Sequence, residues 1–474
     1  MSPTIGGGMA EIKKPATREI IKDFAEEINS RKIECKSPSK MAINFRKDWA
    51  DGKESKVWSV PTAILRYRKY NGRIASDVLH YERNIGPLKE TDDQDQRQLF
   101  EFLEQKDPER TEALMKSIKH SGQREPAIIT CDGFLINGNR RKMVMEKLLK
   151  ENPGEDNFKF MKVVILPGEE DEGGPPTLVE IEEIENRYQL QSDGKSEYYG
   201  FDRALSIKRK IELGFSLEQQ LRDDPRFAGA SKGDIKKKIK EYNNKYLDPL
   251  ECIDRYLNQF NRDGLYRTVS AGMSDREGRW QAFTDYSDTY KRFFANQKRL
   301  IEYGIEEEEV GDIEEAAFNI IRLRHLPDLP KVHTVMRNLH KYCRTKEGKK
   351  AIKKISEEVE PSSPNDFKDD NGEHLPFDEV DAKWAAKNKQ HIIYNLKKAI
   401  KSHENLKEKE TPLELLEAAY KKLTHEDMDL STISLGDHPT ARSLASKIQK
   451  KANELENEIY QYEKQIKKFK NKKP

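Results

Sequence analysis

The residues best suited to chemistry lie between positions 131 and 141, where a glycine turn runs into two adjacent arginines. Asp132-Gly133 is a hairpin-turn dipeptide, because its left-handed conformation costs little for glycine. An apolar Phe-Leu-Ile run follows, and Asn137-Gly138-Asn139 then leads into Arg140 and Arg141. A glycine turn at a helix start leaves backbone N–H groups free at the positive end of the helix dipole. Two arginines add donors that match phosphate oxygens. The segment therefore predicts a phosphate-binding turn, the alternative being a plain strand–turn–helix with solvated arginines.

The elements that must position this turn alternate between strands and helices. Short apolar runs predict strands at 60–65, 127–130, 133–136 and 161–166. Helical patterns occupy 111–120 and 140–150. Beyond residue 178 the pattern is almost entirely helical, with one turn-rich linker. The chain is therefore predicted to be α+β, with a small mixed α/β domain followed by a predominantly helical C-terminal half and a coiled coil.

The same patterns predict how the chain is divided. We expect an N-terminal helix and loop extension, an α/β domain, a helix-turn-helix-like unit, a helical domain, a linker and a last helical region, at 1–56, 57–190, 195–248, 249–360, 361–380 and 381–474.

Composition limits the classes of function. Lys plus Arg number 86 and Asp plus Glu 84, so the formal net charge is only +2 and nucleic-acid binding would need a local basic patch. The four cysteines have no CxxC spacing, which indicates reduced thiols in a cytoplasmic protein and no zinc site. No apolar run approaches the roughly 20 residues of a membrane helix, and no signal-peptide core is present. We therefore expect no membrane contact.

Two helical segments after residue 215 have the order of a helix-turn-helix. Leu217–Leu221 follows Ser216, a favourable N-cap, and Lys232–Asn243 forms the second helix. The turn between them is longer than the usual three or four residues. The second helix would present four basic side chains suited to DNA phosphates rather than to base edges: Lys236, Lys237, Lys238 and Lys240. The alternative is a helical hairpin with solvated lysines.

The clearest periodic signal lies near the C-terminus. Apolar residues step by four and three in turn at Ile448, Ala452, Leu455, Ile459, Tyr462, Ile466 and Phe469. This spacing indicates a coiled-coil stripe. It predicts either a helix packed on the chain's own bundle or a homodimer contact.

The order of parts from about 57 to 245 resembles the N-terminal domain of ParB-type partition proteins. That family has a helix, a Gly-x-x-Gln-Pro turn, a hairpin, Gly-Glu-Arg-Arg leading into a helix, and a later Glu-Asn-x-x-Arg element. A helix-turn-helix comes directly afterwards. The segments that carry the resemblance here are Glu112–His120, Gly122–Pro126, Gly138–Arg141 and Glu185–Gln189, with a looser match at Tyr70–Ile74.

The resemblance implies a nucleoside-triphosphate switch, binding CTP or ATP, that works on DNA. Glu185 and Asn186 would hold Mg²⁺ and support hydrolysis, since a hard cation prefers oxygen ligands. The nucleotide would be bound by Gly122, Glu125, Pro126, Gly138, Asn139, Arg140 and Arg141, of which the glycine and arginines of the second turn would contact phosphates.

Three positions depart from the family pattern: Asn139 replaces Glu, Glu125 replaces Gln, and Gln189 replaces Arg. They leave open the nucleobase and whether the nucleotide is hydrolysed. A sulfiredoxin is not expected, because the phosphate turn lacks a thiol and Cys131 lies at the other end of the hairpin. Two alternatives stay open: a phosphotransferase or nuclease of a bacterial or phage conflict system, and a non-catalytic helical adaptor that binds other proteins.

Overall fold

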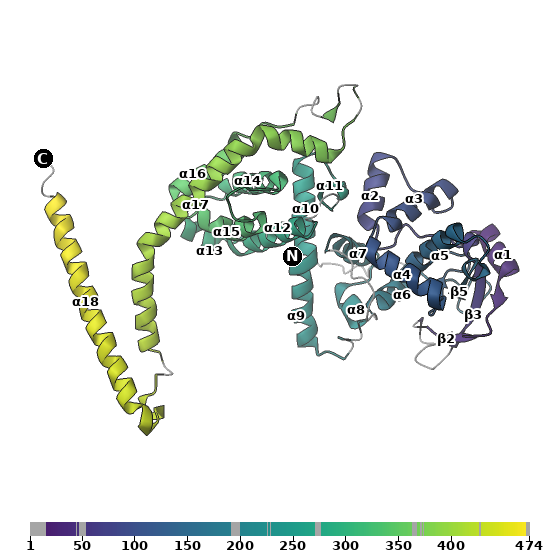
Figure 1. The fold of residues 1–474 in the computed structure, drawn as a ribbon, viewed down its shortest axis with the longest axis horizontal. Coiled ribbons are helices and arrows are strands. Elements are labelled where there is room, and N and C mark those ends of the chain that lie inside the picture. The colour runs from purple at the N-terminus through teal and green to yellow at the C-terminus, as the bar shows by residue number, and fades with distance from the viewer. Residues whose placement is uncertain are drawn as a thin grey trace, which may run out of the picture. The chain divides into compact units, whose positions relative to one another are not determined.

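The computed structural model describes residues 16–43, 45–46, 54–190, 200–224, 226–227, 229–270, 276–362, 367–369, 372, 374–425 and 428–470. The chain divides into two compact units, one ending at His403 and the other beginning at Glu404. Helices predominate, and five short strands form a mixed sheet (Figure 1). The predicted α+β class is confirmed.

The sheet lies in the first unit, in the order β1-β3-β5-β4, with β2 also paired to β3. β3 (Glu54–Pro61) runs antiparallel to β1 (Ile33–Glu34), β2 (Lys40–Ala42) and β5 (Phe160–Ile165). β4 (Ala127–Ile129) runs parallel to β5. A parallel pair needs a crossover connection, and helix α5, described below, lies between these two strands in the sequence.

Alternate residues of β4 and β5 enter two different cores. Ala127, Ile129 and Val163 belong to one hydrophobic cluster, whereas Ile128 and Val164 belong to another. All five are fully buried. Successive side chains of a strand point to opposite faces, so the sheet is covered on both sides.

The helices of this α/β part take opposite sides of the sheet. α3, α4 and α5 supply side chains to the cluster of Ala127, and α6 supplies Ile181 and Ile184 to the cluster of Ile128. The bounds are α1 (Lys22–Arg31), η1 (Thr62–Ile64), α2 (Ala75–Asn84), α3 (Asp93–Glu104), α4 (Pro108–Ser121), α5 (Asn139–Glu151), η2 (Asp156–Phe158) and α6 (Leu178–Leu190).

The strand predicted at 133–136 is wrong. Phe134 and Leu135 form only isolated bridges, with Arg66 and Ile129 respectively. The Gly133 N–H donates to the Thr130 carbonyl at 3.0 Å, and the Thr130 N–H donates to the Phe134 carbonyl at 2.9 Å. The chain therefore reverses in a tight turn between Thr130 and Phe134, and the pairing beyond it, such as Ile136 N–H to the Ile128 carbonyl at 2.9 Å, does not form a continuous strand.

The remaining helices of the first unit share one hydrophobic core that extends from Phe201 to Ala399. α9 passes without a break through a π-helical turn into α10. The bounds are α7 (Gly200–Glu212), α8 (Leu217–Arg222), α9 (Lys232–Tyr242), η3 (Asn243–Leu247), α10 (Asp248–Gln259), α11 (Arg267–Ser270), α12 (Arg276–Thr289), η4 (Tyr290–Phe294), α13 (Gln297–Tyr303), α14 (Glu309–Leu323), α15 (Val332–Tyr342) and α16 (Lys346–Glu357).

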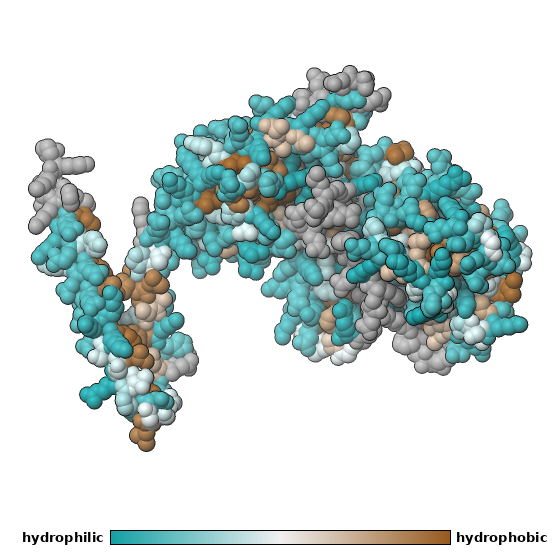
Figure 2. Space-filling model, in the orientation of Figure 1, coloured by the Kyte–Doolittle hydropathy of each residue, from teal (hydrophilic) through white to brown (hydrophobic). Residues whose placement is uncertain are grey.

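The second unit consists of the C-terminal part of α17 (Phe377–Leu423), the short turns η6 (Leu430–Thr432) and η7 (Leu435–Asp437), and α18 (His438–Lys470). α18 contains the predicted stripe, and Ile448, Ile459, Tyr462 and Ile466 are between 45% and 65% exposed. Figure 2 shows apolar side chains at the surface of this unit. Within the described part of the chain, none of the helices is both long and apolar enough to cross a membrane.

Gly138→Ala should destabilise the protein by about 2–4 kcal/mol, because it combines a left-handed backbone with a steric clash. Gly138 has φ +84°, and an added Cβ would lie 2.7 Å from the Ala127 Cβ. Gly304→Ala is the control, because Gly304 is also left-handed at φ +61° but has nothing within 4 Å of the added Cβ. It should cost only about 1 kcal/mol. Urea unfolding followed by circular dichroism measures both, and equal effects would contradict the packing argument.

Candidate functional site

The turn before α5 is held by β4. The Asn137 Oδ1 accepts a hydrogen bond from the Ile128 N–H at 2.7 Å, so the Asn137 side chain extends the sheet edge. Gly138 follows in a left-handed conformation as the N-cap of α5. Its missing Cβ allows the turn to lie against Ala127. The N-terminus of α5 is thus fixed directly beside the end of the sheet.

The other predicted turn lies next to this helix start. Gly122 ends α4 with φ +68°. The Gln123 side chain binds both the N–H and the carbonyl of Lys162, each at 2.7 Å. Arg141 donates to the carbonyl of Glu125, and Pro126 is buried. The structure therefore brings Gly122–Pro126 and Gly138–Arg141 together.

Arg140 belongs to a cluster of three arginines, Arg73, Arg110 and Arg140, hereafter the arginine cluster. Arg140 binds the Asp107 carboxylate at 2.7 Å, and an Arg73 nitrogen lies 3.9 Å from the same carboxylate. Asp107 itself has a left-handed backbone at the N-cap of α4. Burial and the charge of Arg73 lower the pKa of Arg140; Asp107 opposes the shift and Arg110 adds to it. Arg73 and Arg110 thus place positive charge beside Arg140, and clustered positive charge favours an anion.

Asn139 is the first residue of α5 and is only 6% exposed. Its Oδ1 has no hydrogen-bond partner among the described residues. A buried polar atom without a partner costs free energy and is often explained by a ligand or an ordered water. The atom lies at the same helix start as the arginine cluster.

Glu185 and Asn186 lie in the interior rather than at an open surface. They are 3% and 7% exposed. Glu185 Oε1 accepts the Gly72 N–H at 3.2 Å, and Arg68 lies 3.9 Å from its other oxygen. Burial and the neighbouring Glu182 raise the pKa of Glu185, and Arg68 and Lys210 oppose that shift. Gly72, which Glu185 contacts, directly precedes Arg73 of the arginine cluster in the sequence.

Asn186 is engaged at both ends of its amide. Its Oδ1 accepts from the Lys210 ammonium at 3.2 Å, and its Nδ2 donates to the Gln220 carbonyl at 3.2 Å. Among the described residues, no group of three or more His, Cys, Asp or Glu side chains could hold a metal ion. As they stand, Glu185 and Asn186 do not fit Mg²⁺, because the amide oxygen faces a lysine ammonium and the carboxylate lies between cationic side chains.

The predicted DNA-contacting lysines lie on α9. Lys236, Lys237 and Lys240 are exposed, whereas Lys238 is half-buried and binds Glu241 at 2.6 Å. α8 and α9 begin with Ser216 and Ser231 caps, and Ser216 forms a complete capping box with Gln219. Ile235 on the opposite side of α9 is buried. Three of the four predicted lysines therefore face solvent on an anchored helix.

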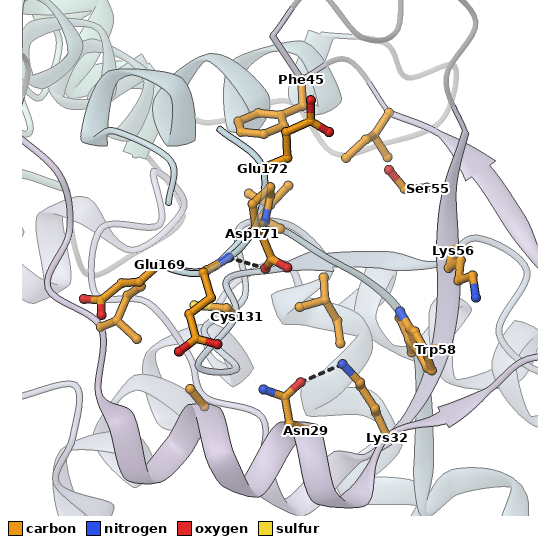
Figure 3. Close-up of a pocket in the computed structure, with 18 of the residues that line it drawn as sticks. Asn29, Lys32, Phe45, Ser55, Lys56, Trp58, Cys131, Glu169, Asp171 and Glu172 are labelled. Atoms are coloured by element: carbon orange, nitrogen blue, oxygen red, sulfur yellow. Dashed lines mark hydrogen bonds between the residues drawn. The ribbon is translucent and has the colours of Figure 1, made fainter. Parts of the chain in front are cut away.

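A pocket of about 760 Å³ lies elsewhere in the α/β part, and none of the predicted site residues lines it. Figure 3 shows Trp58 and Lys56 of β3, Lys32, and the acidic loop with Glu169, Asp171 and Glu172 around it, with Cys131 among the lining residues. Burial and Asp132 raise the pKa of Cys131 to about 11, so its thiol is protonated near neutral pH. This pocket was not predicted; the acidic run after β5 was its only visible signal in the sequence.

Sequence reasoning also missed Asp107, Arg110 and Lys210, because each acts through a partner distant in the sequence. No protein-family model, curated protein or solved structure matches this chain.

Proposed function

We propose that this chain binds a nucleoside triphosphate, CTP or ATP, at the N-terminus of α5 and acts as a nucleotide-dependent switch on DNA. The observation that carries the proposal is the arginine cluster at a helix start whose cap must be glycine. A triphosphate supplies the negative charge that the clustered positive charges of Arg73, Arg110 and Arg140 favour. Arginine forks and free helix N–H groups both suit phosphate oxygens.

The proposed nucleotide site has a direct structural route to the helix-turn-helix-like unit. Asn186 on α6 donates to the Gln220 carbonyl of α8, and the neighbouring Arg187 binds Asp223 at the end of α8 at 3.1 Å. A change at α6 would therefore move α8, which packs beside α9. This contact is the connection through which a switch would act.

DNA would be bound by the exposed lysines of α9. The segment from 232 to 245 contains six lysines and two acidic residues, a local excess of four positive charges in a chain of net charge +2. Lysines on an exposed helix suit phosphate contacts, which give affinity rather than sequence specificity.

Self-association would occur through the second unit. Besides the α18 stripe, α17 exposes Leu413, Leu416, Tyr420 and Leu423, whose spacing is three, four and three. Two stripes of this kind on one unit favour pairing with a second copy. The same exposed side chains favour the second candidate function, an adaptor that binds other proteins without a nucleotide.

Arg140→Ala should weaken nucleotide binding by roughly tenfold to a hundredfold, since hydrogen bonds to charged groups contribute about 1.5–3 kcal/mol. Calorimetry with CTP, ATP, GTP and UTP measures the affinity and identifies the nucleotide. Arg66→Ala is the matched control, because Arg66 is similarly shielded and paired with Asp93 at 3.2 Å in the same α/β part. Unchanged affinity in the Arg140 variant would reject the site. Absence of binding by the unmodified protein would favour the adaptor.

Charge reversal of Lys236, Lys237 and Lys240 to Glu should weaken binding to duplex DNA by at least roughly tenfold at moderate salt and flatten its salt dependence. Fluorescence anisotropy with a labelled duplex at several salt concentrations measures both. The matched control reverses the charge of three exposed lysines on α15 and α16, namely Lys341, Lys346 and Lys350. Equal losses in the two triple variants would mean that only net charge matters and would contradict a site on α9.

Ile459→Glu with Ile466→Glu should convert a dimer to a monomer, because the charges would enter the apolar stripe. Light scattering coupled to gel filtration gives the mass. Asn457→Glu with Gln461→Glu adds the same charge to α18 outside the stripe and should remain dimeric. A monomeric unmodified protein would rule out this contact.

A further inference from the structure

We propose that Lys210 takes the place of a divalent cation in this chain, so that the triphosphate binds without Mg²⁺. The inference rests on the nucleotide site proposed above and specifies its metal requirement. It concerns the carboxylate–amide pair Glu185 and Asn186, the oxygen ligands that a cation would be expected to use.

Lys210 comes from α7 and is only 2% exposed. Its ammonium donates to the Asn186 Oδ1 at 3.2 Å. Burial lowers the pKa of Lys210, and the charges of Glu185 and Glu182 oppose that shift. The Lys210 ammonium therefore contacts the amide oxygen and is attracted by the charges of two carboxylates, as a bound cation would be.

Other contacts around Glu185 and Asn186 disfavour a metal ion. Gly72 N–H occupies one oxygen of Glu185. Arg68 binds Glu182 at 2.9 Å and lies 3.9 Å from Glu185, and Arg209 lies 3.2 Å from Glu182. A divalent ion would add two positive charges beside three cationic side chains in the protein interior. That placement would be unfavourable unless Lys210 withdrew.

The first test is calorimetric titration of the full chain with the nucleotide in excess Mg²⁺ and again in EDTA. The expected affinities agree within about twofold, a difference of less than roughly 0.5 kcal/mol. Binding in Mg²⁺ that is lost in EDTA would overturn this inference and leave the nucleotide site intact. Binding in neither condition would overturn the nucleotide site itself, and the inference with it.

The second test is Lys210→Met, which removes the charge and keeps most of the length of the side chain. Binding in EDTA should fall by roughly tenfold or more, and Mg²⁺ should restore it by occupying the vacated oxygens. Lys208→Met on the same helix is the control, since Lys208 pairs with Asp254 and is 42% exposed. It should bind equally in both conditions. A folded Lys210 variant that still binds without Mg²⁺ would overturn the inference. If the variant does not fold, the titration of the unmodified protein in Mg²⁺ and in EDTA is the deciding measurement.

Discussion

The buried ionic network on α6 is the constraint on which much of the first unit depends. Glu182 and Arg68 are both less than 5% exposed and bind each other at 2.9 Å. Glu185 and Asn186 extend the network to the loop at Gly72 and to Lys210. Removing one member of such a pair commonly costs about 3–5 kcal/mol, because the other charge stays buried. The network fixes α6, α7 and the loop at 68–73 as one assembly, and this loop carries Arg73.

Buried ion pairs also join other helices that are distant in the sequence. Lys106 lies between Asp77 and Asp202, at 2.7 and 3.1 Å, and joins α2 to α7. Asp381 of α17 binds Arg262 at 2.8 Å and Arg322 at 2.9 Å, and so attaches α17 to the helical core. A chain with more charged than hydrophobic residues, 36% against 35%, thus uses paired charges where larger cores would use apolar contacts alone.

The arginine cluster differs from these networks in its position at a helix start. Around Asp381, the cationic partners hold the carboxyl pKa below its usual value, despite burial. Burial and Arg73 lower the pKa of Arg140, and burial and Arg262 likewise lower the pKa of Arg322 beside Asp381. A lowered arginine pKa therefore also accompanies a structural ion pair. The position of Arg140 at the N-terminus of α5, beside an Asn139 Oδ1 that lacks a hydrogen-bond partner among the described residues, distinguishes the candidate binding site from a structural ion pair.

The sequence by itself determined the α+β class, the short strands β4 and β5, the glycine turn before α5 and the periodic stripe of α18. Each is a local pattern, readable because strand alternation, left-handed glycine and heptad spacing involve residues near one another in the chain. Only the tertiary structure decided that residues 133–136 form isolated bridges instead of a strand, that Asp107 pairs with Arg140, and that Lys210 faces Asn186. The two side-chain contacts join residues 24 and 33 positions apart, so no periodicity in the sequence predicts them. The charged and polar neighbours of Glu185 and Asn186 surround them because both residues are buried. Burial arises only when the chain packs, so the sequence alone does not show it.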